Sequence, residues 1–431
     1  MNINSSRLHN LNLNVRGIQP SATLRINELS NHLKSEGKKI YKLGLGQSPF
    51  PVPAPVIKSL QENAFQKDYL PVKGLSDLRE SIAHYFQRRQ DIDCEMDDVI
   101  IGPGSKELLF ILQLAYYGDL IIPKPSWVSY APQAQIIGRS IHWLPTRAEN
   151  NWQLTAEEID LVCRDDPTRP RILILNYPNN PTGCTYSDSQ LRAIAEVARK
   201  YKLILLSDEI YGELNYEGNH RSIAQYYPEG SIISSGLSKW CGAGGWRLGA
   251  FVFPKEQRPL LDAMAIIASE TFTATSAPIQ FAAVTAFNGG TEIDNYLNGS
   301  RQILAYLGSY FYRRLKQMKI DAVQPEGAFY IFPSFANYKT KLAQREIFTS
   351  IALCKALLED TGVAILPASD FGFPSDFLSV RIAFVDFNGE EALNAVKTQF
   401  ASKEIDDTFV TDFCPNLFDA LNTLETWLQA L

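Results

Sequence analysis

The feature that most constrains the fold is an alternation of short apolar runs and longer helical patterns in the first two thirds of the chain. The runs are rich in Ile, Leu and Val and scarcely alternate with polar residues, as expected of strands buried on both faces. They occupy residues 99–101, 120–122, 172–175, 203–206, 232–233 and 249–253. The helical patterns between and around them occupy residues 75–89, 106–117, 188–201 and 255–267. The sequence therefore predicts an α/β fold with a mostly parallel sheet flanked by helices.

A change of pattern at residues 288–290 predicts a second domain. The sequence Asn-Gly-Gly there precedes a long amphipathic helix pattern, and only short strand and helix patterns follow it. We expect a large domain at residues 56–295 and a smaller α+β domain at 296–431, whose last residues, 406–431, form a helical cover. Residues 1–55 show no sheet pattern, and we expect them to pack on the small domain or on a partner subunit.

Composition excludes several classes of function. A net charge of −6 gives no electrostatic footprint for nucleic acid or an anionic membrane. The six cysteines are scattered without CxxC spacing and the five histidines stand apart, so no metal site is predicted. No stretch has the length and apolarity of a membrane span, and the polar N-terminus lacks a signal-peptide core. The cytoplasm is the expected location, with an organelle-targeting N-terminus as the alternative.

Polar clusters follow four of the apolar runs, where ligands of parallel sheets bind. Residues 102–107 form a small-residue turn that opens a helix, a candidate anion site. Residues 176–183 read by themselves as a rigid structural turn. Asp208 and Glu209 could bind metal or cap the next helix. Lys239, amid small hydroxyl residues, could be a solvated charge, a phosphate ligand, or an amine whose lowered pKa lets it attack a carbonyl.

Taken together, these clusters resemble the class I/II aminotransferases, pyridoxal-phosphate-dependent enzymes of fold type I in the aspartate aminotransferase superfamily. The motifs NPTG, DEIY, SK followed by WRLG, and VRIAF occur in family order and spacing at residues 180–183, 208–211, 238–249 and 380–384. Residues 18–23 are similar to the usual opening of the family. The resemblance covers nearly the whole chain. It implies ping-pong transfer of an amino group between an L-amino acid and a 2-oxo acid.

The resemblance assigns catalytic roles to named positions. Lys239 would bind pyridoxal 5'-phosphate as a Schiff base and then move a proton at the substrate's α-carbon. Asp208 would pair with the pyridine nitrogen of the cofactor. Asn180 and Tyr211 would donate hydrogen bonds to the ring oxygen, and Trp127 would stack on the ring.

Binding roles follow from the same resemblance. The phosphate would bind to Gly104, Ser105, Lys106 and Arg247. Tyr69 would reach the cofactor of a second subunit, which implies a homodimer with shared active sites. Arg381 would bind the α-carboxylate of the substrate through two hydrogen bonds, near the backbone of Gly46. Trp127 and Asn180 would face the substrate as well.

Two departures from the family pattern affect the expected site. Gly236 stands where many relatives have a phosphate-binding serine, so that contact passes to Ser234, Ser235 or Ser238. Phe272 stands where classical aspartate aminotransferases have a partner-subunit arginine for the distal carboxylate. Aspartate and prephenate aminotransferases instead have a lysine at the position of Lys106. We hypothesise that Lys106 binds acidic side chains while Phe272 tolerates aromatic ones; alternatively, Lys106 only assists the phosphate or points to solvent.

Other functions are compatible with parts of this pattern. A carbon–sulfur β-lyase or a kynurenine-type aminotransferase would need the same Lys239, Asp208 and Arg381. A ligand-sensing transcription regulator would carry a winged helix-turn-helix domain ahead of this fold. Only 42 residues precede residues 43–46 here, too few for that module and a linker, so the sensor is the remote alternative.

Overall fold

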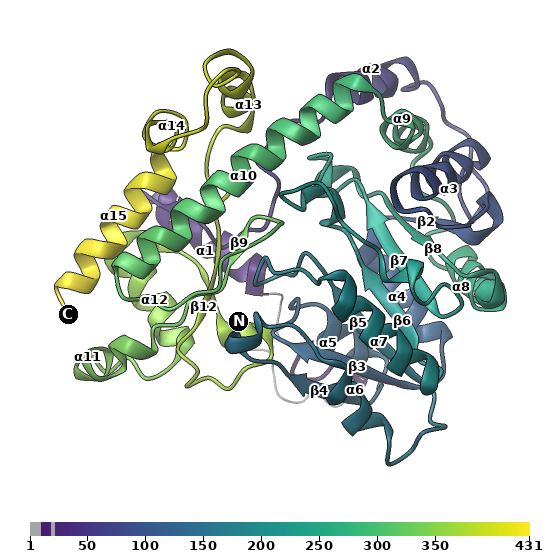
Figure 1. Cartoon of the computed structure of the whole chain (residues 1–431), viewed down its shortest axis with the longest axis horizontal. Coiled ribbons are helices and arrows are strands. Elements are labelled where there is room, and N and C mark those ends of the chain that lie inside the picture. The colour runs from purple at the N-terminus through teal and green to yellow at the C-terminus, as the bar shows by residue number, and fades with distance from the viewer. Residues whose placement is uncertain (1–9, 19–21) are drawn as a thin grey trace.

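The computed structural model describes residues 10–18 and 22–431 (Figure 1). The opening motif expected at residues 18–23 therefore lies partly outside the described residues. No helix within the described ranges combines the length and the hydropathy that crossing a membrane requires.

A seven-stranded sheet forms the larger part of the molecule. Its strand order is β2-β8-β7-β6-β5-β3-β4. The strands are β2 (Val99–Gly102), β3 (Asp119–Lys124), β4 (Ile141–Pro145), β5 (Arg171–Asn176), β6 (Ile204–Asp208), β7 (Ser231–Gly236) and β8 (Gly249–Val252). Only β8 runs antiparallel to its neighbours, β2 and β7. The predicted α/β class with a mostly parallel sheet is confirmed. The prediction omitted β4, an edge strand that is only partly buried and contains His142.

Helices bury both faces of this sheet, which explains why its strands do not alternate. In β5, Ile172 and Ile174 pack with the helices of one face, whereas Leu173 and Leu175 pack with those of the other. The first face carries α4 (Ser105–Ala115), α5 (Tyr130–Ile136) and α8 (Arg258–Ser269). The second carries α6 (Ala156–Cys163) and α7 (Asp188–Lys200). The helices α2 (Ala54–Glu62), α3 (Ser76–Gln90) and α9 (Ala277–Asn288) pack together beside β2.

A long helix, α10 (Thr291–Gln317), leads from this layer to a second, smaller sheet (Figure 1). The smaller sheet is antiparallel, in the order β11-β12-β9. Its strands are β9 (Tyr330–Ile331), β11 (Leu366–Pro367) and β12 (Val380–Ala383). The helices after α10 are α11 (Lys339–Gln344), α12 (Ser350–Thr361), α13 (Gly389–Thr398), α14 (Asp407–Phe413) and α15 (Pro415–Gln429). We call residues 54–288 the large-sheet region and residues 318–431 the small-sheet region; the proposed domain boundaries stay a prediction.

The N-terminal segment contains structure that the sequence pattern did not predict. After α1 (Ala22–Ser35), the strand β1 (Tyr41–Lys42) pairs in parallel with β10 (Val363–Ala364). Residues 1–55 thus contain a strand, although their sequence shows no sheet pattern. A pairing of two residues is too short to leave a periodic pattern in the sequence.

Candidate active site

A cavity of about 270 Å³ opens at the carboxyl ends of the central strands of the large sheet. Its walls come from the turns after β3, β5, β6 and β7 and from the start of α4. The lining residues are Ser105, Lys106, Trp127, Tyr130, Asn176, Asn180, Asp208, Ile210, Tyr211, Ser238, Lys239 and Arg247. Most of the residues that the motifs singled out thus meet in one place.

Lys239 projects into this cavity from the segment after β7. Its Nζ donates a hydrogen bond to the carbonyl oxygen of Gly46, 2.6 Å away. A Cβ atom on Gly46 would lie 1.9 Å from the hydroxyl of Tyr330, so only glycine fits there. Burial, and then the Arg381 guanidinium, lower the pKa of Lys239 to about 7. A substantial fraction of the amine is therefore uncharged and nucleophilic at neutral pH.

The acid end of the cavity is centred on Asp208, at the end of β6. The Tyr130 hydroxyl donates to Oδ2 at 2.5 Å and the Ser234 hydroxyl donates to Oδ1 at 3.1 Å. Burial raises the pKa of Asp208, while these two hydrogen bonds act in the opposite direction. Sequence reasoning missed Tyr130, although its place three residues after Trp127, at the start of α5, offered a signal.

The cation end, formed by Lys106 and Arg247, is at the start of α4. Gly104 precedes the helix with φ +89°, and a Cβ there would lie 2.2 Å from Arg247 Nη2. Arg247 donates to the carbonyl oxygens of Gly244 and Pro103, and neither it nor Lys106 forms an ion pair with any described residue. The protein around Lys106, and then Arg247, lower the pKa of that lysine. A helix N-terminus with two unpaired cations is an anion site.

The wall between the two sheets holds a fully buried arginine. Arg381, in β12, is 2% exposed, and its Nη1 donates to Asn180 Oδ1 at 3.1 Å. Its Nη2 donates to the Gly44 carbonyl, whereas its Nε has no hydrogen-bond partner among the described residues. Beside it, the Tyr211 and Tyr330 hydroxyls share a hydrogen bond of 2.7 Å. Sequence reasoning did not single out Tyr330.

Three residues from the motifs lie away from the cavity. Tyr69, between α2 and α3, is 92% exposed and does not line the cavity of its own chain. Phe272 packs on the apolar cluster around α8. Glu209 is buried and turns away from Asp208: its carboxylate accepts hydrogen bonds from Ser207 and Ser222 and lies 2.9 Å from His220 Nε2. Glu209 therefore supports the turn after β6 rather than lining the site.

The serines near Lys239 differ in their contacts. The Ser234 hydroxyl is bound to Asp208, and Ser235 faces a small void beside Glu209. Ser238 lines the cavity. Of the three candidates for a phosphate contact, only Ser238 is in the cavity wall.

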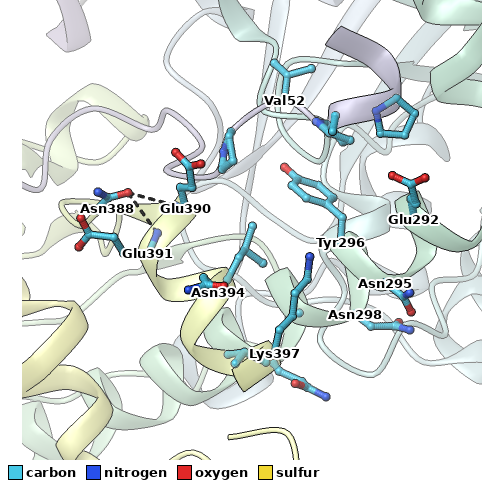
Figure 2. A pocket seen from close by; sticks show the side chains of 18 residues that line it. Val52, Glu292, Asn295, Tyr296, Asn298, Asn388, Glu390, Glu391, Asn394 and Lys397 are labelled. Carbon is cyan, nitrogen blue, oxygen red and sulfur yellow. Dashed lines mark hydrogen bonds between the residues drawn. The ribbon is translucent and has the colours of Figure 1, made fainter. Parts of the chain in front are cut away.

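A larger groove, of about 1020 Å³, lies elsewhere (Figure 2). It runs between residues 51–55, α10 and α13, and Figure 2 shows Tyr296, Glu390 and Lys397 in its walls. The Asn388 side chain there accepts hydrogen bonds from the amides of Glu390 and Glu391 and so caps α13. None of the site residues expected from the motifs lines this groove. The larger of these two cavities is therefore not the one in which the expected site residues meet.

The smaller cavity fits pyridoxal phosphate. The cofactor has an aldehyde for an uncharged lysine, a phosphate for unpaired cations and a ring nitrogen that a carboxylate keeps protonated. Lys239, the cation end and Asp208 supply these three partners within one cavity. The class of protein that the fold and this cavity define is that of the fold-type-I pyridoxal-phosphate enzymes.

Comparison with known proteins narrows the class. The family model "Aminotransferase class I and II" matches residues 38–397. Aspartate aminotransferase of Bacillus subtilis is 31% identical, over 89% of this chain and 97% of its own length. The enzyme of the same name from Geobacillus stearothermophilus is 34% identical, over 86% and 93%. The solved structure of Thermus thermophilus aspartate aminotransferase with maleate superimposes with a TM-score of 0.79 at 29% identity, covering 91% of this chain and 98% of that one.

The chain belongs to the aminotransferase class I and II family. It is a pyridoxal-phosphate-dependent transaminase that moves an amino group between an amino acid and a 2-oxo acid.

Proposed function

We propose that this aminotransferase uses amino acids with an acidic side chain, aspartate or glutamate, as donors and the matching 2-oxo acids as acceptors. The observation that carries the proposal is Lys106. Its ammonium group stands at the cavity wall, 5.0 Å from the centre of the Trp127 ring, and has no carboxylate partner among the described residues. A second substrate carboxylate would supply that partner. The names of the Bacillus and Geobacillus relatives and the maleate in the Thermus structure agree with this substrate class.

Arg381 is proposed to bind the other carboxylate of the substrate, the one next to the amino group. Its guanidinium is buried, and the hydrogen bonds to Asn180 and Gly44 use two of its five N–H groups, which leaves Nε and the second hydrogens of Nη1 and Nη2 for a carboxylate. Asn180 keeps the group in place from one side. Lys106 and Arg381 would then hold the two ends of a dicarboxylate, with Trp127 and the Gly46 backbone between them.

The chemical roles of the remaining residues are part of the same proposal. When bound, pyridoxal phosphate supplies an electron sink for charge that develops at the substrate's α-carbon. Lys239 Nζ, with its pKa near 7, removes and returns the proton at that carbon. Asp208, whose two oxygens accept hydrogen bonds from Tyr130 and Ser234, holds a proton on the ring nitrogen. Tyr211 and Asn180 donate hydrogen bonds to the ring oxygen.

For the phosphate, the proposed ligands are the cation end and one serine: Gly104, Ser105, Lys106, Ser238 and Arg247. Tyr69 would complete the site of a partner subunit, in a homodimer with shared active sites. Its 92% exposure supports this, as does that of Phe65, which is 74% exposed on the same loop. The six free cysteines are compatible with a reducing compartment, which supports the cytoplasm as the proposed location.

The Lys106→Ala variant tests the substrate class. We expect kcat/KM for aspartate and glutamate to fall about tenfold or more, the worth of one charge-assisted hydrogen bond, and that for alanine to change less than about threefold. Arg247→Lys is the control, because a residue that serves only the phosphate should affect all donors equally. If Lys106→Ala also weakened acidic and neutral donors equally, Lys106 would serve the cofactor alone.

A further inference from the structure

One side chain of the large-sheet region is inserted among aromatic rings of the small-sheet region. Trp152 follows β4 in the large-sheet region, whereas Phe332, Phe373 and Phe377 follow β9 and β11. The centre of the Trp152 ring lies 5.8, 5.7 and 6.4 Å from those of the three phenylalanines, each in an edge-to-face arrangement. Edge-to-face pairs at these separations contribute beyond the burial of their area. Trp152 is therefore an anchor between the two regions.

The backbone conformation at this position is unusual for the residues that occupy it. Asn151 and Trp152 have φ values of +51° and +57°, in the left-handed region that L side chains rarely adopt. The Trp152 amide donates to the Arg147 carbonyl at 2.8 Å and closes the turn that holds this conformation. A bulky residue in a strained turn points to a constraint that the surrounding structure imposes. Here the constraint is the direction of the indole toward the phenylalanines.

The aromatic contact continues to Arg381. The Phe332 ring lies 6.0 Å from that of Phe371, and the Phe371 ring centre lies 5.3 Å from the Arg381 guanidinium carbon. The Phe371 carbonyl also accepts a hydrogen bond from the Ser126 amide, next to Trp127 in the cavity wall. Packed rings thus connect Trp152 with Arg381. The hydrogen bond from Ser126 also joins Phe371 to the cavity wall.

We propose that Trp152 is a positioning residue: by docking the small-sheet region onto the large-sheet region, it holds Arg381 where a substrate carboxylate can bind. The proposal rests on the carboxylate-binding role of Arg381 put forward above. Trp152 itself does not line the cavity, so it acts only through the phenylalanines and Arg381.

Maleate provides the test, because it is a dicarboxylate without an amino group and reports carboxylate binding without turnover. We expect Trp152→Ala in the cofactor-loaded enzyme to raise the Kd for maleate about tenfold, since small displacements at a binding site have effects of this size or larger. The Kd for pyridoxal phosphate should change less than about twofold. Trp152→Phe, which keeps a ring, should restore most of the maleate affinity. Leu161→Ala, at an exposed position of α6, is the matched surface control.

Three outcomes bear on the proposed positioning role of Trp152. Equal maleate affinity in Trp152→Ala and the unmodified enzyme would overturn the positioning role, provided that Arg381→Lys loses the affinity. If Arg381→Lys also binds maleate normally, the proposed role of Arg381 fails, and the positioning proposal fails with it. If Trp152→Ala does not fold, Phe377→Leu on the other side of the contact replaces it, with the same expected loss and the same contradicting result.

Discussion

The two ends of the cavity are built in opposite ways. At the acid end, each oxygen of the buried Asp208 carboxylate accepts a hydrogen bond from a neighbouring hydroxyl. At the cation end, Arg247 is exposed and contacts only backbone carbonyls, and Lys106 likewise has no acidic partner among the described residues. The acid end is thus complete within the protein, whereas the cation end requires an anion from outside.

This difference indicates what each end contributes. A preorganised, buried carboxylate keeps a fixed position and acts on charge that develops during reaction. Unpaired cations at a helix start contribute binding energy when an anion arrives. We therefore expect changes at the acid end to affect the rate and loss of Arg247 at the cation end to affect cofactor affinity.

The largest effect is expected for Asp208→Ala. Removal of the carboxylate should lower kcat about a thousandfold, as found for lost electrostatic stabilisers of a transition state. The cofactor should still bind, because the cation end and Lys239 are intact. Measurement of kcat with aspartate and of bound cofactor per subunit separates the two effects. Asp262→Ala, at an exposed carboxylate, is the control. An unchanged kcat in Asp208→Ala would contradict the assignment of the acid end to the rate.

Arg247→Ala should show the reverse pattern. Loss of its proposed charge-assisted hydrogen bonds to the phosphate is expected to raise the Kd for pyridoxal phosphate about 10- to 100-fold. With saturating cofactor, kcat should return to within a few fold of the unmodified value. Equilibrium titration of the apoenzyme measures the affinity, and Arg192→Ala on the exposed face of α7 serves as the comparison. A loss of kcat that saturating cofactor does not restore would show that the cation end acts in the chemistry too.

Between the two ends, Lys239 should give cofactor uptake a characteristic pH dependence. Its pKa is lowered from the usual 10.5 to about 7, so the amine is protonated below this value and free to react above it. The rate of cofactor uptake by the apoenzyme should therefore rise about tenfold from pH 6 to pH 8 and level off beyond. Stopped-flow absorbance measures it. A rate that continued to rise to a midpoint near pH 10 would mean that the amine is not perturbed.

The smallest effect is expected for Tyr130→Phe. The hydroxyl of Tyr130 lowers the pKa of Asp208, so its removal should raise that pKa and require a higher pH to keep the carboxylate ionised. The acidic limb of the kcat profile should therefore move to higher pH. An acidic limb that moved to lower pH would contradict the assigned direction of the hydrogen bond's effect.

Part of this arrangement is predictable from the sequence for a physical reason. Asn180, Asp208 and Lys239 each lie at the end of an apolar run or in the turn after it, and parallel strands bring such positions to one edge of a sheet. The structure places all three in one cavity, while their chemical roles stay predictions.

Other parts depend on contacts that no local pattern reveals. The Tyr130 hydroxyl is hydrogen-bonded to Asp208, 78 positions away in the sequence, and Tyr211 is hydrogen-bonded to Tyr330, 119 positions away. The strands β1 and β4 escaped prediction because one is only two residues long and the other is a half-exposed edge. The position of Trp152 depends on the left-handed backbone conformation of Asn151 and of Trp152 itself. Neither residue is a glycine, which would have indicated this conformation in the sequence.

The most direct test of the account is a half-reaction with cofactor-loaded enzyme. Aspartate, glutamate, alanine and phenylalanine are each mixed with it, and the yellow absorption of the bound cofactor is followed until 2-oxoglutarate is added. The account predicts that the band disappears at least about tenfold faster with the two acidic donors than with alanine and returns with the 2-oxo acid. A band that no amino acid changed, or that phenylalanine removed fastest, would contradict a dicarboxylate aminotransferase built around Lys239, Lys106 and Arg381.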